Sequence, residues 1–137
     1  NNTKNPFHIA DEIISKLNEV GVDYIFVDFH AEASAEKIAM GYYLNGRVSC
    51  VFGTHTHVQT ADDQILENGT AYITDIGMTG PKNGVIGMDK DAALKRFVTS
   101  LPERYKIATG ETMFNSVLFE IDDNTNKVKN ITRINKN

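Results

Sequence analysis

The chain has 137 residues, of which 41% are hydrophobic and 23% charged, and it contains one cysteine. This size and composition predict a single soluble globular domain over residues 1–137, without an internal disulfide. The net charge of −4 argues against general nucleic-acid binding through a basic surface. No apolar run approaches the ~20 residues of a membrane-spanning helix, and no secretory signal is apparent. We therefore expect a cytoplasmic protein that does not contact a membrane.

The first predicted elements are a helix and a short strand. Asn5-Pro6 is typical of an N-cap followed by proline in the first helical turn. Apolar residues follow at helical spacing until Gly21. They are Ala10, Ile13, Ile14 and Leu17. The run 24–27 is apolar at consecutive positions, which predicts a strand covered on both faces.

A second helix and a second strand complete a βαβ unit. The helix is predicted to begin at Ser34, to turn Ile38, Ala39 and Tyr42 inward, and to end at Asn45-Gly46. The run 48–52 predicts another buried strand. Strand, helix and strand at this spacing indicate parallel strands joined by a right-handed crossover.

The remaining segments indicate a change from parallel to antiparallel structure. A short strand is predicted over residues 70–74, and a glycine-rich loop over 77–87. Asp89 is expected to cap a helix that ends near Leu101, before Pro102. Three further strands are expected over 105–108, 113–121 and 127–134, the last two joined by a turn at 122–126. The predicted fold class is α/β in the first part, with antiparallel strands afterwards.

Three histidines stand directly after the two predicted parallel strands. His30 follows the first strand, and His55 and His57 follow the second. Ligand sites in parallel sheets form outside the carboxyl ends of the strands, where these imidazoles would meet. Neutral imidazole is a good ligand for zinc, iron or manganese. Histidine also has many structural roles, so a structural cluster is the alternative interpretation; His8, in the first helical turn, is interpreted as structural.

Carboxylates are needed if the histidines belong to a two-metal hydrolytic site. None of the nearest acidic residues has an obvious bridging position, and Asp62-Asp63 resembles a solvated turn. The candidates are Asp28, Glu32, Asp62 and Asp75. Cys50 lies inside an apolar run and is interpreted as a small buried residue rather than a nucleophile. From residue spacing alone, the histidine cluster is incomplete.

Two blocks of the sequence carry a family resemblance. They read FVDFHAEASAEKIAMGYYLNGRVSCVFGTHTHVQTAD (26–62) and GTAYITDIGMTGPKNGVIGMD (69–89). These blocks closely resemble the YmdB-type branch of the calcineurin-like metallophosphoesterases, which are described as 2′,3′-cyclic-nucleotide 2′-phosphodiesterases. The resemblance extends from about Pro6 to the end of the chain. A bare GTHTH is weak evidence, but the whole of 27–89 is specific.

The resemblance implies a four-layer α/β/β/α fold and a dinuclear centre, usually of iron or manganese. His30, His55 and His57 match the histidine ligands that the second half of such a protein contributes. By analogy, His30 and His55 would hold one metal and His57 the other. Family members are about twice this length, and their first half supplies the aspartate, the bridging glutamate, the asparagines and the histidine expected to act as general acid. The chain is thus interpreted as the C-terminal half of a metallophosphoesterase.

Two hypotheses of function follow. In the first, the parent enzyme hydrolyses cyclic nucleotides or related phosphodiesters, and this chain alone is inactive or weak. In the second, the chain is a non-catalytic metal-binding or interaction module that self-associates or pairs with the missing half, because half of a two-sheet sandwich would expose apolar surface.

Overall fold

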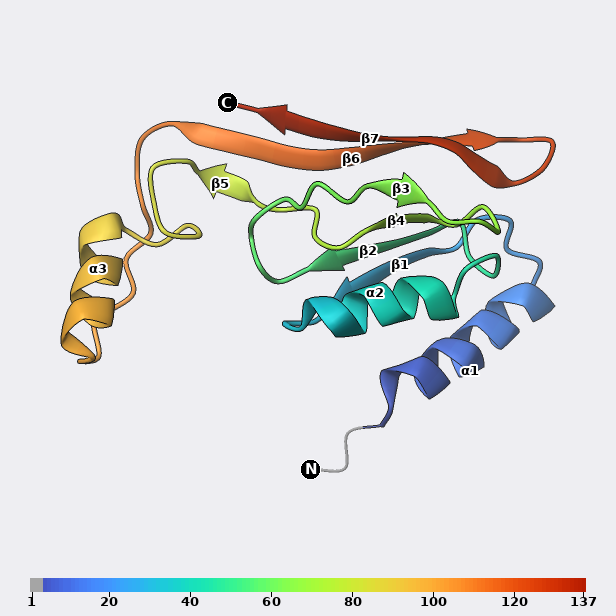
Figure 1. Ribbon diagram of the computed structural model, residues 1–137, viewed down its shortest axis with the longest axis horizontal. Coiled ribbons are helices and arrows are strands. Elements are labelled where there is room, and N and C mark those ends of the chain that lie inside the picture. Colours follow the sequence, from blue (N-terminus) through green and yellow to red (C-terminus); the bar gives the residue numbers. More distant parts are fainter. Residues whose placement is uncertain (1–3) are drawn as a thin grey trace.

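Two β-sheets and three α-helices make up residues 4–137, the part of the chain that the computed structural model describes (Figure 1). One sheet has four strands in the order β1-β2-β4-β3, and the other has three in the order β5-β6-β7. In chain order the elements are α1 (Pro6–Glu19), β1 (Phe26–His30), α2 (Ser34–Tyr43), β2 (Cys50–Thr54), β3 (Gln64–Ile65), β4 (Ala71–Ile73), β5 (Thr79–Pro81), α3 (Lys90–Thr99), β6 (Thr112–Asp122) and β7 (Lys127–Lys136).

The first helix begins where the sequence predicts, but the first strand differs from its prediction. The Asn5 side chain accepts a hydrogen bond from the Phe7 N–H (2.9 Å) and caps α1. Ile14 is buried in the core, whereas Ile13, predicted to be on the same stripe, is half exposed. Strand β1 lies at the sheet edge with alternating exposure, so the prediction of a strand covered on both faces is wrong.

The predicted βαβ unit is confirmed. Strands β1 and β2 pair in parallel, with His30 opposite Thr54, and β2 pairs in parallel with β4. The predicted inward face of α2 is wrong, because Ile38 and Tyr42 are exposed. The buried residues are Lys37, Met40 and Gly41.

Close packing against β4 and its following loop explains the orientation of α2. A Cβ atom at Gly41 would lie 2.5 Å from the Tyr72 ring, so the helix approaches the sheet at a residue without a side chain. Lys37 is turned inward to an acidic partner, Asp75. Apolar periodicity cannot reveal an inward-facing lysine.

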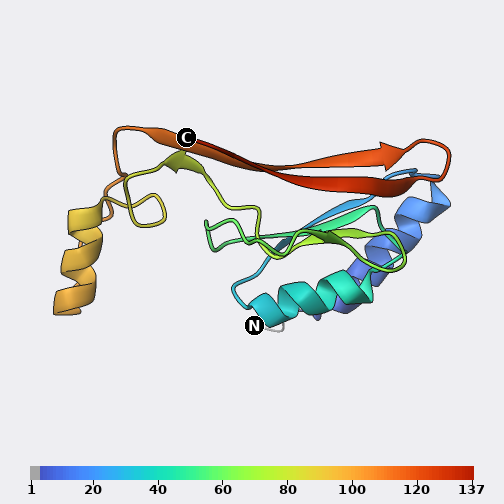
Figure 2. The ribbon, with the colours of Figure 1, turned by 45° about the horizontal axis from the view of Figure 1, so that its top comes forward.

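Two apolar layers lie on opposite faces of the four-stranded sheet. Helices α1 and α2 cover one face, and the ribbon of β6 and β7 covers the other (Figures 1 and 2). The helix side is centred on Met40, Leu44 and Val51. On the other side, the Phe52 and Phe119 rings stack with centroids 6.5 Å apart. The predicted face-to-face arrangement of two sheets is therefore confirmed, with helices outside the four-stranded sheet.

The C-terminal part is largely as predicted. Asp89 caps α3 through its side chain, which accepts from the Ala92 N–H (3.0 Å). Strands β6 and β7 form the predicted antiparallel pair. The predicted strand at 105–108 is wrong, since only an isolated bridge joins Ile107 to Met88.

None of the helices within residues 4–137 has the length and apolar character needed to cross a membrane. The cytoplasmic location stays a prediction.

Candidate metal centre

The carboxyl ends of three parallel strands place the candidate site at one edge of the four-stranded sheet. We call this edge the rim and define it as residues 30, 53–60 and 74–77, which end or follow β1, β2 and β4. His30 is the last residue of β1 and Thr54 the last of β2, and they are register partners. Parallel pairing therefore brings together side chains that are 24 residues apart in sequence.

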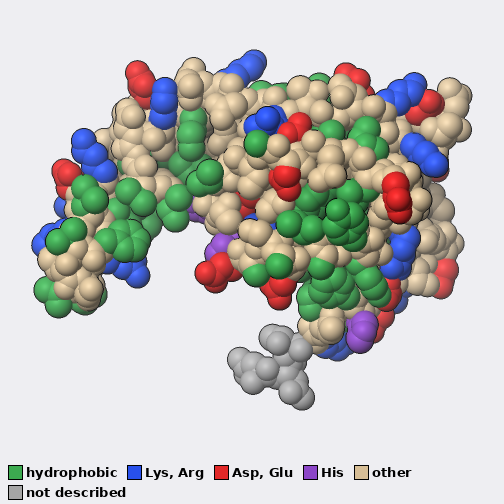
Figure 3. Space-filling model, viewed as in Figure 1, with side chains coloured by type: hydrophobic (Ala, Val, Ile, Leu, Met, Phe, Trp, Pro, Cys, Tyr) green, Lys and Arg blue, Asp and Glu red, His purple; other side chains and the backbone are tan. Residues whose placement is uncertain are grey.

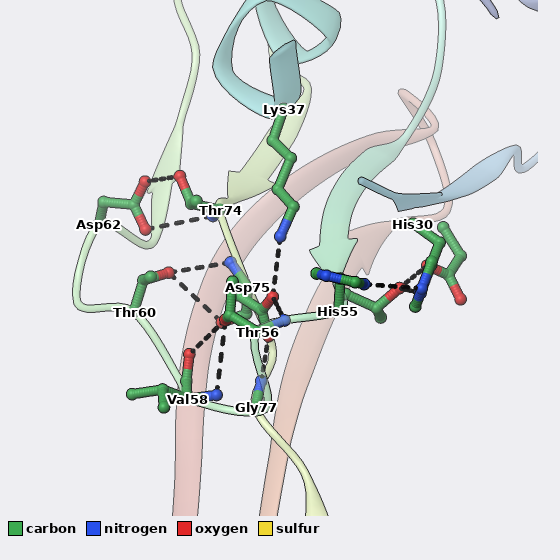
Figure 4. Close-up of polar contacts among 12 residues, drawn as sticks. His30, Lys37, His55, Thr56, Val58, Thr60, Asp62, Thr74, Asp75 and Gly77 are labelled. Atoms are coloured by element: carbon green, nitrogen blue, oxygen red, sulfur yellow. Dashed lines mark hydrogen bonds and ion pairs between the residues drawn. The ribbon is translucent and has the colours of Figure 1, made fainter. Parts of the chain in front are cut away.

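His30 and His55 face each other across the rim (Figure 4). The Nε2 atom of His30 lies 3.0 Å from Nδ1 of His55, and the two rings meet edge to face. Both side chains belong to exposed residues at the end of their strands. The convergence predicted for this pair is confirmed.

The neighbours of His30 determine which of its nitrogens carries a proton. The Thr54 hydroxyl donates to the Asp28 carboxylate (2.8 Å), so the same oxygen must accept from His30 Nδ1–H (3.0 Å). In the neutral ring, the lone pair of His30 is then on Nε2, on the side of His55. A histidine whose other nitrogen is held by such an outer hydrogen bond has the orientation typical of a metal ligand.

His57 does not join the pair. Its Nδ1 lies 2.9 Å from the Ile86 carbonyl oxygen, which can only accept, so Nδ1–H donates. This contact leaves Nε2 as the free nitrogen of a neutral ring. The structure thus brings two of the three predicted histidines together and places the third against the loop before α3.

The backbone around the two rim histidines has unusual torsion angles. His55 has φ +112° and His57 has φ +64°. Residues other than glycine rarely adopt such positive φ angles. Such residues cost about 1–3 kcal/mol each and persist only where neighbouring contacts determine the conformation. Thr56 lies between the two histidines and makes a contact that fixes this backbone.

Asp75 holds Thr56 from the end of β4. Its Oδ2 accepts from the Thr56 N–H and from the Lys37 ammonium, each at 2.9 Å, and its Oδ1 accepts from the Gly77 N–H at 2.9 Å (Figure 4). Lys37 and Asp75 are 1% and 0% exposed. Burial raises the pKa of Asp75, but Lys37 and the donated N–H groups lower it by more, so the net pKa is below the ordinary carboxyl value.

The other acidic candidates have structural partners or lie apart. The Asp62 side chain accepts from both the backbone N–H and the hydroxyl of Thr74, and Asp63 pairs with Arg133. The interpretation of Asp62-Asp63 as a solvated turn is therefore wrong. Glu32 is exposed in the segment before α2. Within residues 4–137, no three His, Cys, Asp or Glu side chains come together closely enough to hold a metal ion by themselves.

Two residues interpreted as structural have ordinary environments. Cys50 is fully buried, and burial raises the pKa of its thiol, so it is a core residue as predicted. His8 is exposed on α1.

Sequence reasoning missed Lys37 and the roles of Asp28, Thr54 and Asp75. For Asp28 and Thr54 a pattern was available: they flank His30 across the predicted parallel pair, one two residues before it and the other at its register position. For Lys37 no pattern was available, because its partner is 38 residues away.

Comparison with known proteins supports the resemblance seen in the sequence. A family model described as YmdB-like protein matches residues 1–134. A 2′,3′-cyclic-nucleotide 2′-phosphodiesterase of Bacillus subtilis (strain 168) is 55% identical over 129 residues, which are 94% of this chain and 48% of that protein. A putative phosphatase/phosphodiesterase of Mycoplasma pneumoniae is 42% identical over 127 residues, 92% of this chain and 44% of that protein.

Two solved structures have the same fold as this chain. A crystal structure described as a novel phosphatase of Mycoplasma pneumoniae superposes with a TM-score of 0.91 at 40% identity, over 98% of this chain and 47% of that one. A hypothetical protein from Thermus thermophilus superposes with a TM-score of 0.89 at 37% identity, over 97% and 51%. The chain spans about half the length of the relatives it matches. With the family model covering nearly every residue and the fold shared at this similarity, the chain belongs to the YmdB-like protein family.

Proposed function

We propose that the full-length protein is a metal-dependent phosphodiesterase that hydrolyses 2′,3′-cyclic nucleotides or related phosphodiesters. Its centre would hold two ions of iron or manganese, with His30, His55 and His57 as ligands. The observation that carries the proposal is the meeting of His30 and His55 at the carboxyl edge of the parallel sheet. The names of the relatives, a cyclic-nucleotide phosphodiesterase and a putative phosphatase/phosphodiesterase, support the reaction class.

The geometry of the two imidazoles suits a shared metal ion. Histidine nitrogens bind metal at about 2.0–2.1 Å, so two nitrogens that share one ion lie no more than about 4 Å apart. The separation of His30 Nε2 and His55 Nδ1 is 3.0 Å. His57 is oriented by the Ile86 carbonyl so that its Nε2 is available, which suits a ligand of the second ion.

In hydrolysis, water forms a new bond to phosphorus while the bond to the 2′-oxygen breaks, leaving a 3′-phosphate and a free 2′-hydroxyl. Bound divalent or trivalent cations supply the positive charge that stabilises the phosphoryl oxygens and activates water. The residues of this chain hold and orient the ligand nitrogens. Thr54 and Asp28 fix the His30 ring, and the Ile86 carbonyl fixes the His57 ring.

We further propose that this chain alone has little or no activity. Its three ligands are neutral, and a two-metal site needs a bridging anion as well. Because the chain matches only 48% and 44% of the two named relatives, the remaining ligands and the general acid would come from the rest of the protein.

The test compares histidine variants of the intact protein. The variants His30→Ala, His55→Ala and His57→Ala should each lose bound iron or manganese, measured by elemental analysis. Each should also lose at least about 100-fold in kcat/KM on 2′,3′-cyclic AMP, as expected when a metal ligand is removed. The matched control is His8→Ala, because His8 is exposed on α1. Phosphorus NMR of the product should show a 3′-phosphate.

Full metal content in all three rim variants would contradict the ligand assignment. Turnover by the isolated chain at the rate of the intact protein would contradict the division of the site between this chain and the rest.

A second candidate function is an interaction module, and a surface groove favours it. An open groove of about 510 Å³ runs between α1 and strand β1. Its walls include Ile13, which is 51% exposed, and Phe26, which is 47% exposed. Among the described residues β1 pairs only with β2, so its other edge has unpaired backbone groups. We propose that the rest of the full-length protein, or a second copy of the chain, covers this groove.

Sedimentation of the isolated chain tests this second candidate. A dimer that returns to a monomer on Phe26→Glu substitution would support pairing of two copies through the β1 edge. A monomer that forms a 1:1 complex with the separately produced remainder of the protein would support covering by that remainder. A monomer that binds neither partner would contradict the interaction module.

A further inference from the structure

Stability alone does not explain the buried ion pair between Lys37 and Asp75. Its two charges are almost completely removed from water, at 1% and 0% exposed. Replacing a buried ion pair by apolar residues of similar volume is often neutral or stabilising, so such a pair is weak evidence for a contribution to stability. The pair therefore needs another explanation, and the contacts of Asp75 provide one.

Asp75 holds the segment 56–60, which follows His55 and contains His57, at both of its ends (Figure 4). Its carboxylate accepts from the Thr56 N–H at 2.9 Å. Its backbone oxygen accepts from the Thr60 N–H (3.0 Å), and its own N–H donates to the Thr60 hydroxyl (2.9 Å). The segment 56–60 is thus tied to the end of β4 at its first and last residues.

Thr56 lies between the two histidines, so a tether at this residue acts on both of them. Its neighbours His55 and His57 both have positive φ angles, +112° and +64°. Those angles send the two rings in different directions, one to His30 and the other to Ile86. Without a fixed Thr56 N–H, relaxation of either φ angle would turn its ring away from its present partner.

Lys37 fixes the carboxylate that holds Thr56. The ammonium and the Thr56 N–H share the same oxygen, Oδ2. The lysine side chain reaches it over Gly53, where a Cβ atom would lie 2.7 Å from Lys37 Cδ. The ammonium comes from α2, so helix packing is coupled to the conformation of the rim.

We propose that Lys37 and Asp75 are positioning residues: through the Thr56 N–H they set the backbone that aims His55 toward His30 and His57 toward Ile86. Neither residue is proposed to touch a metal or substrate. The metal-binding part of this inference rests on the proposed function, whereas the part that concerns ring and backbone positions does not.

The experiment uses a graded set of variants of the intact protein. Lys37→Met with Asp75→Ala removes both charges and both carboxylate acceptors. Lys37→Met with Asp75→Asn removes the charges but leaves one acceptor oxygen and serves as the conservative variant. Arg47→Met with Asp11→Ala is the matched control, because it removes an ion pair whose two side chains are each 40% exposed and which does not touch the rim.

Two measurements on the metal-free protein test positioning directly. In wild type, the Thr56 amide should exchange with solvent at least about 10-fold more slowly than an unprotected amide, since it is hydrogen-bonded. Nitrogen-15 spectra should show His57 with its proton on Nδ1. In the Asp75→Ala double variant the Thr56 protection and this tautomer preference should be lost. The Asp75→Asn variant should be intermediate, and the control should resemble wild type.

The third measurement is calorimetric titration with Mn²⁺. The Asp75→Ala double variant should bind Mn²⁺ roughly 10–100-fold more weakly, as is typical when an outer contact of a ligand is removed. Again the Asn variant should be intermediate and the control unchanged.

An unprotected Thr56 amide in wild type would overturn the proposal, and this result does not depend on any variant folding. Wild-type ring spectra and Mn²⁺ affinity in the Asp75→Ala double variant would also overturn it. If wild type binds neither Mn²⁺ nor Fe²⁺, the proposed metal-dependent function fails, and amide exchange and ring spectra still decide whether Lys37 and Asp75 position the loop.

Discussion

The rim and helix α3 both lie beyond the ends of strands, but they are held in opposite ways. At the rim, buried and half-buried polar groups tie the loop to α2 and β4, with Asp75 at the centre. Helix α3 buries only Ala93, while Phe97 and Val98 are 75% and 81% exposed. Hydrophobic side chains gather on this helix (Figure 3).

The difference shows that a side chain can be exposed to solvent while its backbone has a fixed conformation. The rim histidines are exposed, yet their backbone is set by contacts to buried groups. The apolar residues of α3 have the composition of a core but little of its packing. A change at the rim should therefore have large effects on stability, and a change on α3 small ones.

The largest expected effect on stability comes from Gly53, where β2 passes close to the end of β4. A Cβ atom there would lie 1.8 Å from the Thr74 carbonyl oxygen, which is backbone and cannot move aside cheaply. Gly53→Ala should lower the free energy of unfolding by about 3 kcal/mol or more, which is the top of the usual range for overpacking. Urea denaturation would measure the change.

Gly80→Ala is the matched control, because the nearest neighbouring side chain would be 3.8 Å from the new Cβ atom. It should change the unfolding free energy by less than about 1 kcal/mol. Equal effects at the two glycines would show that the rim is no more tightly packed than β5.

A smaller effect, with a defined pH dependence, is expected at Asp62. Burial raises its pKa, but the nearby Thr60 hydroxyl and the hydrogen bonds from the Thr74 hydroxyl and N–H lower it by more, so the net pKa in the folded protein is below 3.8. A carboxyl whose pKa is lower in the folded state stabilises the protein above its unfolded pKa, and that contribution is lost as pH falls through the folded value.

Wild type should therefore lose unfolding free energy more steeply below pH 3.8 than Asp62→Asn does. Urea denaturation at several pH values would give the two slopes. Parallel slopes would mean that the Asp62 carboxylate is not preferentially stabilised in the folded protein.

Patterns that are local in sequence predicted the framework. Capping residues located the starts of α1 and α3 at Asn5 and Asp89. Two apolar runs with a helix between them predicted the parallel pair, and so the meeting of His30 and His55. In each case the relevant residues are neighbours in sequence or share one predicted strand end.

Interactions between distant residues could not be predicted in this way. From sequence alone, Lys37 is expected on the surface of α2. Only the structure shows that Asp75, 38 positions later, lies beside it. Asp62 is likewise expected in a solvated turn, and only the structure shows that Thr74 donates to it. The turn of His57 toward Ile86 depends on a positive φ angle, which histidine adopts too rarely to be expected from its identity.

The smallest effect is expected on the exposed face of α3. Phe97→Ser and Val98→Ser should each change the unfolding free energy by no more than about 0.5 kcal/mol, as for other exposed positions. Leu44→Ala, at a residue with 0% exposure, is the contrasting variant and should cost about 2–5 kcal/mol. If the two α3 variants instead destabilised the intact protein as much as Leu44→Ala, the apolar face of α3 would be covered in the whole protein. The contrast between rim and helix would then hold only for this chain.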